Sequence, residues 1–233
     1  MKILCIIPAR SGSKEVPGKN LKILSGKPLI HWPILAAKKV SRINRLIIST
    51  DSREIADCSS QAGATIPFLR PKTLATSKTH ILDVIKHAVK KEAEAGHHFT
   101  HILVLQATSP TVLASDINSS INLLNKGQFD TIITYYRYQG PNPALMLIKG
   151  EKGLLKKIMD KSQFETQRQN FNDVFVRTGL LYLFSVNNLE NNSIYGEKLS
   201  GIEVKADRAI TIDSFEDFNA AEAYFKTTFK SRE

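Results

Sequence analysis

Short apolar runs alternate along this chain with longer segments whose apolar residues recur at helical spacing. The runs with the length and composition of strands stand at 2–7, 45–50, 64–68, 102–105, 131–135, 179–184 and 209–212. Helices are predicted between them, over 29–40, 51–63, 81–96 and 115–125, and again after residue 214. Capping-box patterns at 51–54 and 214–217 open the second and the last of these helices. The alternation predicts an α/β fold, with a mostly parallel sheet and helices on both faces.

One segment departs from this alternation. Between Arg137 and Val176 the sequence is polar, has few long apolar runs and carries the turn region Gly-Pro-Asn-Pro at 140–143. A chain of 233 residues can bury a full core. We therefore expect a single domain over residues 1–233, from whose main sheet residues 137–176 depart.

The polar loop after the first strand carries the strongest chemical signal. Pro8 ends the strand, because proline cannot donate to a strand ladder. The loop contains serine and glycine residues and three cations, Arg10, Lys14 and Lys19. Free backbone N–H groups, hydroxyls and cations together suit a triphosphate. The loop differs from a P-loop, because Asn20 stands where a metal-binding Ser or Thr would lie.

The ends of three predicted strands point to one cleft. The loops at Pro8, at Thr50-Asp51 and at Gln106 all leave the carboxyl ends of strands. In open α/β sheets, ligands bind beyond these ends. We therefore expect the three loops to converge.

Composition narrows the class of partner. The formal charge of +10 comes from Lys and Arg spread along the chain, without a basic arm or interleaved aromatic residues, so no nucleic-acid partner is expected. No apolar run approaches ~20 residues, which predicts no membrane contact. Cys5 and Cys58 are interpreted as free thiols, which favours a cytoplasmic location. The histidines at 97, 98 and 101 match no zinc pattern and are interpreted as surface residues.

The loop sequence also carries a family resemblance. Residues 8–20, Pro-Ala-Arg-Ser-Gly-Ser-Lys followed by Lys-Asn, resemble the N-terminal signature of the cytidylyltransferases that activate sialic acids and related nonulosonic acids. Further similar segments follow in the family's order at 26–30, 48–51, 68–71, 105–110 and 212–218. The resemblance covers essentially the whole chain. It implies a three-layer Rossmann-like nucleotidyltransferase fold, in which residues 137–176 form a protruding dimerisation arm and the protein is a homodimer.

The same resemblance implies a reaction. The anomeric hydroxyl of a nonulosonic acid attacks the α-phosphate of CTP, and pyrophosphate leaves. Arg10, Lys19 and Asp213 are the implied catalytic residues, with Asp213 also the ligand of Mg²⁺, because a carboxylate at a strand end can hold this ion. The family commonly has Asp-Ile-Asp here, so Thr211 removes one of two carboxylates. Asp217 is assigned to the capping box instead.

The resemblance further implies which residues bind the substrates. Arg70 is expected near the nucleotide base and Gln106 beside the sugar acid. Arg168 and Arg177 are expected at the substrate carboxylate, with a subunit-interface salt bridge as the rival interpretation. The full set is Ala9, Arg10, Ser13, Lys14, Lys19, Asn20, Arg70, Thr79, Gln106, Thr108, Ser109, Arg168 and Arg177. Taken alone, the loop cations and Arg70 would be solvated surface charges, and Gln106 a strand cap.

Three alternatives stay open. The first is a cytidylyltransferase for another keto-sugar acid. The second is a sugar-1-phosphate nucleotidyltransferase, whose longer glycine-rich N-terminal loop is not seen here. The third is a non-catalytic CTP-binding homologue, for which Thr211 is the only argument. The sequence identifies neither a general base nor which nonulosonic acid is used.

Overall fold

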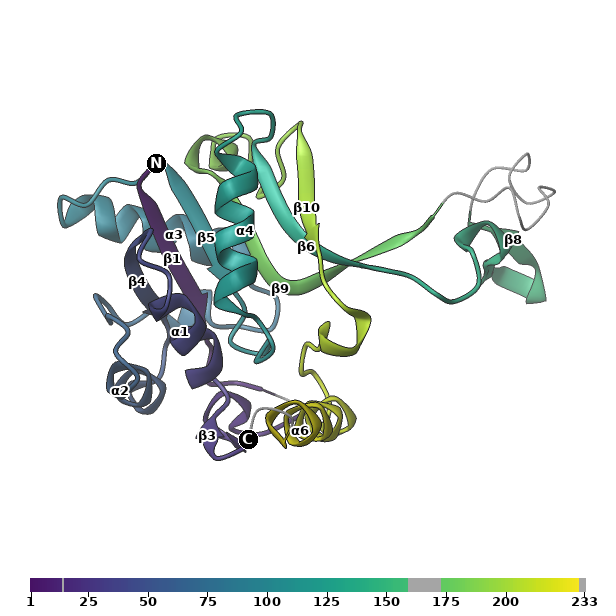
Figure 1. The fold of residues 1–233 in the computed structure, drawn as a ribbon, viewed down its shortest axis with the longest axis horizontal. Helices are drawn as coiled ribbons and strands as arrows, with labels where there is room; N and C mark the ends of the chain where they lie inside the picture. The colour runs from purple at the N-terminus through teal and green to yellow at the C-terminus, as the bar shows by residue number, and fades with distance from the viewer. Residues whose placement is uncertain (14, 159–172, 231–233) are drawn as a thin grey trace.

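A six-stranded sheet forms the centre of the protein (Figure 1). The structure, a computed structural model, describes residues 1–13, 15–158 and 173–230. The strands, in their order across the sheet, are β10 (Leu199–Glu203), β6 (Thr131–Arg137), β9 (Phe175–Ser185), β5 (His101–Leu105), β1 (Ile3–Pro8) and β4 (Ile43–Ser49). Neighbouring strands pair in parallel except at β9, which is antiparallel to both β5 and β6. The predicted mostly parallel sheet is confirmed.

Helices cover both faces of this sheet, as predicted. One face carries α1 (His31–Lys38), α2 (Arg53–Gln61) and α4 (Ala114–Leu124), and the other carries α3 (Ile81–Glu94). Successive residues of a strand point to opposite faces. Accordingly β1 contributes Cys5 and Ile7 to the first apolar cluster and Leu4 and Ile6 to the second, all of them fully buried. The three-layer architecture follows from this double burial.

The last helix brings the end of the chain to the N-terminal loop. α6 (Phe215–Lys230) packs through Phe218 and Phe225 on Leu29 and the hairpin of β2 (Ile23–Leu24) and β3 (Lys27–Pro28). The predicted capping box at its start is confirmed, because Asp217 N donates to Ser214 Oγ and Ser214 N donates to Asp217 Oδ2. This packing places residue 213 beside the loop after β1.

Two predicted strands are wrong. Residues 64–68 form only an isolated bridge between Thr65 and Ile47. Residues 209–212 lie beside 108–111 without forming a strand, joined by the backbone bond from Ile212 N to Thr108 O. The last strand is β10 instead. The sequence pattern missed it, because its Leu-Ser-Gly-Ile-Glu segment interrupts the apolar alternation with a glycine.

Short turns of 3-10 helix complete the described chain. They are η1 (Lys19–Leu21), η2 (Lys72–Leu74), η3 (Pro143–Leu145), η4 (Glu151–Gly153), η6 (Val186–Leu189) and η7 (Ala206–Arg208). None of the helices in the described ranges is long and apolar enough to cross a membrane.

A long excursion leaves the sheet between β6 and β9 (Figure 1). It carries a small antiparallel hairpin of β7 (Leu147–Lys149) and β8 (Leu155–Lys157), far from the body of the protein. Its apolar side chains are exposed, with Leu154 at 65% and Leu155 at 63%. The hairpin lies outside the main sheet, whereas Phe175 and Val176 belong to β9, and the role of the excursion in dimerisation stays a prediction. Arg168 lies outside the described residues.

Candidate active site

A cavity of about 720 Å³ opens at the carboxyl ends of β1 and β5. Pro8 and Gln106, the residues at these strand ends, both line it. The third predicted loop meets them through Asp51, whose carboxylate accepts bonds from the backbone and the hydroxyl of Ser11. The loops at Pro8 and Gln106 therefore meet at one cavity, as expected, and the loop at Thr50-Asp51 adjoins them through Ser11 without lining the described cavity wall.

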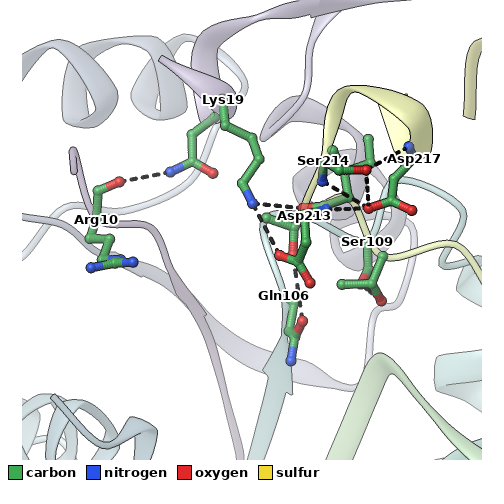
Figure 2. Close-up of polar contacts among 11 residues, drawn as sticks. Arg10, Lys19, Gln106, Ser109, Asp213, Ser214 and Asp217 are labelled. Atoms are coloured by element: carbon green, nitrogen blue, oxygen red, sulfur yellow. Dashed lines mark hydrogen bonds and ion pairs between the residues drawn. The ribbon is translucent and has the colours of Figure 1, made fainter. Parts of the chain in front are cut away.

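Lys19 joins the two ends of the chain across this cavity. Gly18 has a φ of +64°, a conformation that favours glycine, and it starts η1 so that the Lys19 side chain points toward the C-terminal segment. The Lys19 amino group donates to Ile212 O at 2.7 Å and pairs with Asp213 Oδ1 at 3.1 Å. Figure 2 shows this contact next to the α6 cap formed by Ser214 and Asp217. Lys19 and Asp213, which are distant in sequence, therefore lie side by side in the cavity wall.

Asn20 stabilises the conformation of the loop after β1 through two hydrogen bonds. Its side chain is buried, and Nδ2 donates to Arg10 O at 3.0 Å. Its own carbonyl accepts from Ile30 N, which ties the loop to the start of α1. Asn20 therefore orients the loop, and the half-buried Arg10 side chain lines the cavity.

Arg70 is a buried cavity residue rather than the surface arginine that the sequence alone suggests. It is 5% exposed and lines the cavity. Its backbone N–H donates to Thr50 O, which holds the residue against the end of β4. Its Nη2 lies 3.9 Å from Asp51 Oδ1, and within the described chain Nε and Nη2 have no hydrogen-bond partner. Burying unpartnered guanidinium N–H groups is costly, and it places the Arg70 charge next to the cavity.

The cap of α2 differs from the predicted one. Ser52, not Asp51, is the N-cap, and its Oγ accepts from Ile55 N at 3.3 Å. Asp51 is thereby left to bond Ser11 Oγ at 2.6 Å and Ser11 N at 2.9 Å. The sequence showed the aspartate but not its partner, which lies 40 residues away.

We predict that Asp51→Asn destabilises the loop in a pH-dependent way. Burial would raise the pKa of Asp51, but hydrogen bonds from Ser11 and the nearby Arg70 hold this pKa below its ordinary value. A carboxylate with a lowered folded pKa contributes stability above its unfolded pKa and loses it as the pH falls through the folded pKa. Urea unfolding should show a loss of about 1–3 kcal/mol at pH 7 that shrinks at pH 3.

A neighbouring carboxylate provides the control for this experiment. Glu54 is exposed in the first turn of α2, so Glu54→Gln should change the unfolding free energy by less than about 0.5 kcal/mol at either pH. A pH-independent loss in Asp51→Asn would contradict the assigned role of the carboxylate charge.

The backbone of Gly179 packs closely against Gln106, a residue of the cavity wall. A Cβ added there would lie 2.7 Å from Gln106 Oε1 and 2.8 Å from Thr211 Oγ1, which is closer than side chains approach. Thr211 Oγ1 in turn lies 3.3 Å from Ser109 Oγ. Ser109 is fully buried and, among the described residues, is not part of the cavity wall, whereas Gln106 and Thr108 are.

The cavity wall also contains residues that the sequence analysis missed. Arg177 lines the cavity and donates to Tyr195 Oη, with its guanidinium carbon 5.6 Å from the centre of the Tyr195 ring. Tyr195, Tyr182 and Asn192 line the cavity too. Tyr182 could have been found from the alternation along β9, but Asn192 and Tyr195 lie in an irregular segment without a pattern.

Most predicted site residues meet in this cavity. Those that line it are Ala9, Arg10, Ser13, Lys19, Asn20, Arg70, Thr79, Gln106, Thr108, Arg177 and Asp213. Lys14 and Arg168 lie outside the described residues. His97 and His98 are exposed, as predicted, whereas His101 begins β5 and is half-buried.

A model of the cytidylyltransferase family matches residues 4–227. The chain belongs to the cytidylyltransferase family. A CMP-N,N'-diacetyllegionaminic acid synthase of Legionella pneumophila subsp. pneumophila is 44% identical over 110 residues, an alignment that covers 47% of each chain. A pseudaminic acid cytidylyltransferase of Campylobacter jejuni subsp. jejuni is 24% identical over 232 residues, covering 99% of each chain. The resemblance inferred from the sequence is confirmed.

Solved cytidylyltransferases share this fold. A CMP:2-keto-3-deoxy-manno-octonic acid synthetase in complex with CTP superimposes with a TM-score of 0.73 at 16% identity, covering 98% of this chain and 100% of that one. The nucleotidyltransferase fold predicted for this cytidylyltransferase is confirmed.

The donor set of this cytidylyltransferase limits how a divalent metal can bind. No cluster of three or more His, Cys, Asp or Glu side chains suited to a metal occurs in the described part of the chain. The Asp213 side chain is 75% exposed, whereas Asp217 is engaged in the α6 cap. Mg²⁺ is commonly held by one or two carboxylates together with substrate phosphates and water. Asp213 beside a bound triphosphate fits this arrangement, and a ready-made protein cage does not.

Proposed function

We propose that this cytidylyltransferase transfers CMP from CTP to a nonulosonic acid such as sialic, legionaminic or pseudaminic acid. The observation that carries the proposal is the contact of Lys19 with Ile212 O and Asp213, which joins a cationic loop to a carboxylate over the cavity. Relatives named for legionaminic and pseudaminic acid support the choice of substrate class. The free thiols of Cys5 and Cys58 support a cytoplasmic location.

Binding of the triphosphate falls to the loop after β1. Arg10 can contact phosphate oxygens in a bidentate manner, and Lys19 acts as a point charge. Ser13 adds a hydroxyl, and the Arg70 guanidinium adds a positive charge at the cavity wall. These contacts compensate the charge of CTP and of the leaving pyrophosphate.

The acceptor is bound in the same cavity, beside the triphosphate. The Gln106 amide can donate and accept toward sugar hydroxyls, and Arg177 can pair with the substrate carboxylate. The anomeric hydroxyl then gives its proton to water as its oxygen forms a bond to the α-phosphorus, the bond from this phosphorus to the bridging oxygen breaks, and pyrophosphate leaves with the electron pair. Such phosphoryl chemistry is accelerated mainly by positioning and charge stabilisation.

Mg²⁺ is the proposed cofactor, with Asp213 as the residue that would hold it. When bound, the ion would supply positive charge that stabilises the phosphates. Lys19 keeps the Asp213 carboxylate turned toward the cavity through their ion pair at 3.1 Å. Thr211 contributes only a hydroxyl, which lies against Ser109.

The exposed hairpin supports the proposed homodimer. Leu154 is 65% exposed and Leu155 is 63% exposed. Neighbouring apolar side chains that are exposed together indicate an interaction surface. We predict that replacing both with Asp gives a monomer in sedimentation velocity. Ile23→Asp, on an apolar side chain that is 56% exposed outside the hairpin, is the control and should leave the dimer intact. A monomeric wild-type protein would contradict the proposal.

Pyrophosphate release tests the proposed function. The protein is incubated with CTP and Mg²⁺ and with N-acetylneuraminic, legionaminic or pseudaminic acid in separate reactions. Release with one acid, and with CTP rather than the other nucleoside triphosphates, is the expected result. Silence with all three acids, in protein that binds CTP, would refute the proposal and favour another keto-sugar acid or a non-catalytic CTP-binding protein.

A further inference from the structure

A buried ion pair lies behind the active-site cavity. Arg208 donates from Nη1 to Asp116 Oδ2 at 2.7 Å and from Nη2 to Asp116 Oδ1 at 2.6 Å, with side-chain exposures of 12% and 5%. Within the described chain, neither side chain lines the cavity. Two parallel bonds between planar groups fix orientation as well as distance.

Asp116 is a rigid anchor for this pair. It lies in the first turn of α4, where its Oδ2 also accepts from Leu113 N at 2.9 Å. The N-terminus of a helix favours a carboxylate, because its free N–H groups carry partial positive charge. The position of Asp116 is therefore set by the helix and not by Arg208.

Arg208 begins the irregular segment that leads to Asp213. Its carbonyl accepts from Thr111 Oγ1 at 2.6 Å, and Nη1 donates back to Thr111 O at 3.4 Å. Four residues later, Ile212 N donates to Thr108 O at 2.8 Å. Because this segment is not a strand, these contacts replace a strand ladder and fix its alignment with residues 108–111.

The alignment of this segment decides where the site's carboxylate lies. Lys19 Nζ bonds to both the carbonyl of Ile212 and the carboxylate of Asp213, so a shift of the segment would separate them. The Asp213 side chain is 75% exposed and has little packing of its own to hold it.

We infer that Arg208 and Asp116 are positioning residues of the active site, which set the place where Ile212 O and Asp213 meet Lys19. The inference rests on the proposed function, since it matters only if Lys19 and Asp213 face the triphosphate. The two residues act through the backbone of 208–213 and do not touch substrate.

A second ion pair, Arg45–Glu92, provides a control that distinguishes an effect on positioning from an effect on stability. Arg45 Nε lies 2.5 Å from Oε2 of Glu92, whose side chain is fully buried, and within the described chain neither residue lines the cavity. Arg45→Lys also weakens an ion pair with a buried carboxylate, although this pair lacks the two hydrogen bonds that join Arg208 to Asp116. Both variants should lower the melting temperature, because both weaken a buried ion pair.

The kinetic readouts should then differ. We expect Arg208→Lys and Asp116→Asn to lower kcat/KM for CTP about 10–100-fold and to need more Mg²⁺ for half-maximal rate, as residues supporting a metal ligand do. Arg45→Lys should keep wild-type values at the same temperature. In an Asp213→Asn background, Arg208→Lys should cause less than about a threefold further loss, because the residue it positions is already removed.

Calorimetric titration with CTP provides a readout that does not need turnover. Mg²⁺ should strengthen CTP binding to the wild type and to Arg45→Lys, relative to binding in EDTA, and should do so less in Arg208→Lys. Wild-type Mg²⁺ dependence in folded Arg208→Lys would overturn the inference. Failure of the wild type to release pyrophosphate with any acid would instead refute the proposed function.

Discussion

Replacing Lys19 with alanine should lower kcat/KM for CTP about 10²–10³-fold, the usual loss when one donor to a developing negative charge is removed. The Lys19 amino group is the one that reaches both the C-terminal carbonyl of Ile212 and the carboxylate of Asp213. The substitution removes a cation that would bind the phosphates, and it also removes the ion pair that orients the Asp213 carboxylate. The measurement is steady-state pyrophosphate release at saturating acceptor.

Lys22 offers a control three residues along the chain. Its amino group lies 5.5 Å from the ring centres of both Phe215 and Phe218, away from the cavity. Lys22→Ala should therefore keep kcat/KM within about threefold of the wild type. Equal losses in Lys19→Ala and Lys22→Ala would mean that general surface charge, and not the Lys19 contact, supports the reaction.

Asp213 and Asp217 should separate activity from stability. Asp213→Ala should lower kcat about 10²-fold or more, because Asp213 is the proposed metal ligand and, among the described residues that line the cavity, the one carboxylate. It should hardly change the free energy of unfolding, since an exposed ion pair contributes about 0–1 kcal/mol. The paired measurements are the Mg²⁺ dependence of the rate and urea unfolding.

Asp217→Ala should show the reverse pattern. Asp217 Oδ2 accepts from Asp213 N, Ser214 N and Ser214 Oγ, so its loss should lower the free energy of unfolding by about 1–2 kcal/mol. The rate should fall less than about tenfold, because the Asp213 carboxylate itself remains. A large kinetic loss in Asp217→Ala together with a small one in Asp213→Ala would reverse our assignment of the two carboxylates.

Most of the fold was predictable because its main strands and helices have apolar patterns that can be recognised from the local sequence. The run at β1 and the helical spacing at α3 need no distant partner to be recognised. The segment 209–212 misled because its apolar residues serve packing under α6, with Ile212 fully buried there, and not a strand. A segment that is buried against a helix and a strand that is buried in a sheet show the same short apolar run in the sequence.

The candidate site was predictable where its residues follow a strand or stand in the N-terminal loop. Arg10, Lys19 and Gln106 were found in this way, and all three line the cavity. The partnership of Asp51 with Ser11 and of Asp116 with Arg208 was not, because the partners lie 40 and 92 residues apart. Such pairs depend on the folded backbone, which no local pattern encodes.

A crystal structure with CTP and Mn²⁺ would test the central claim most directly, because anomalous scattering locates Mn²⁺. The account predicts a triphosphate between Arg10 and Lys19, the nucleotide in contact with Arg70, and an anomalous peak at the Asp213 carboxylate. Nucleotide bound outside this cavity, or Mn²⁺ bound away from Asp213, would contradict it.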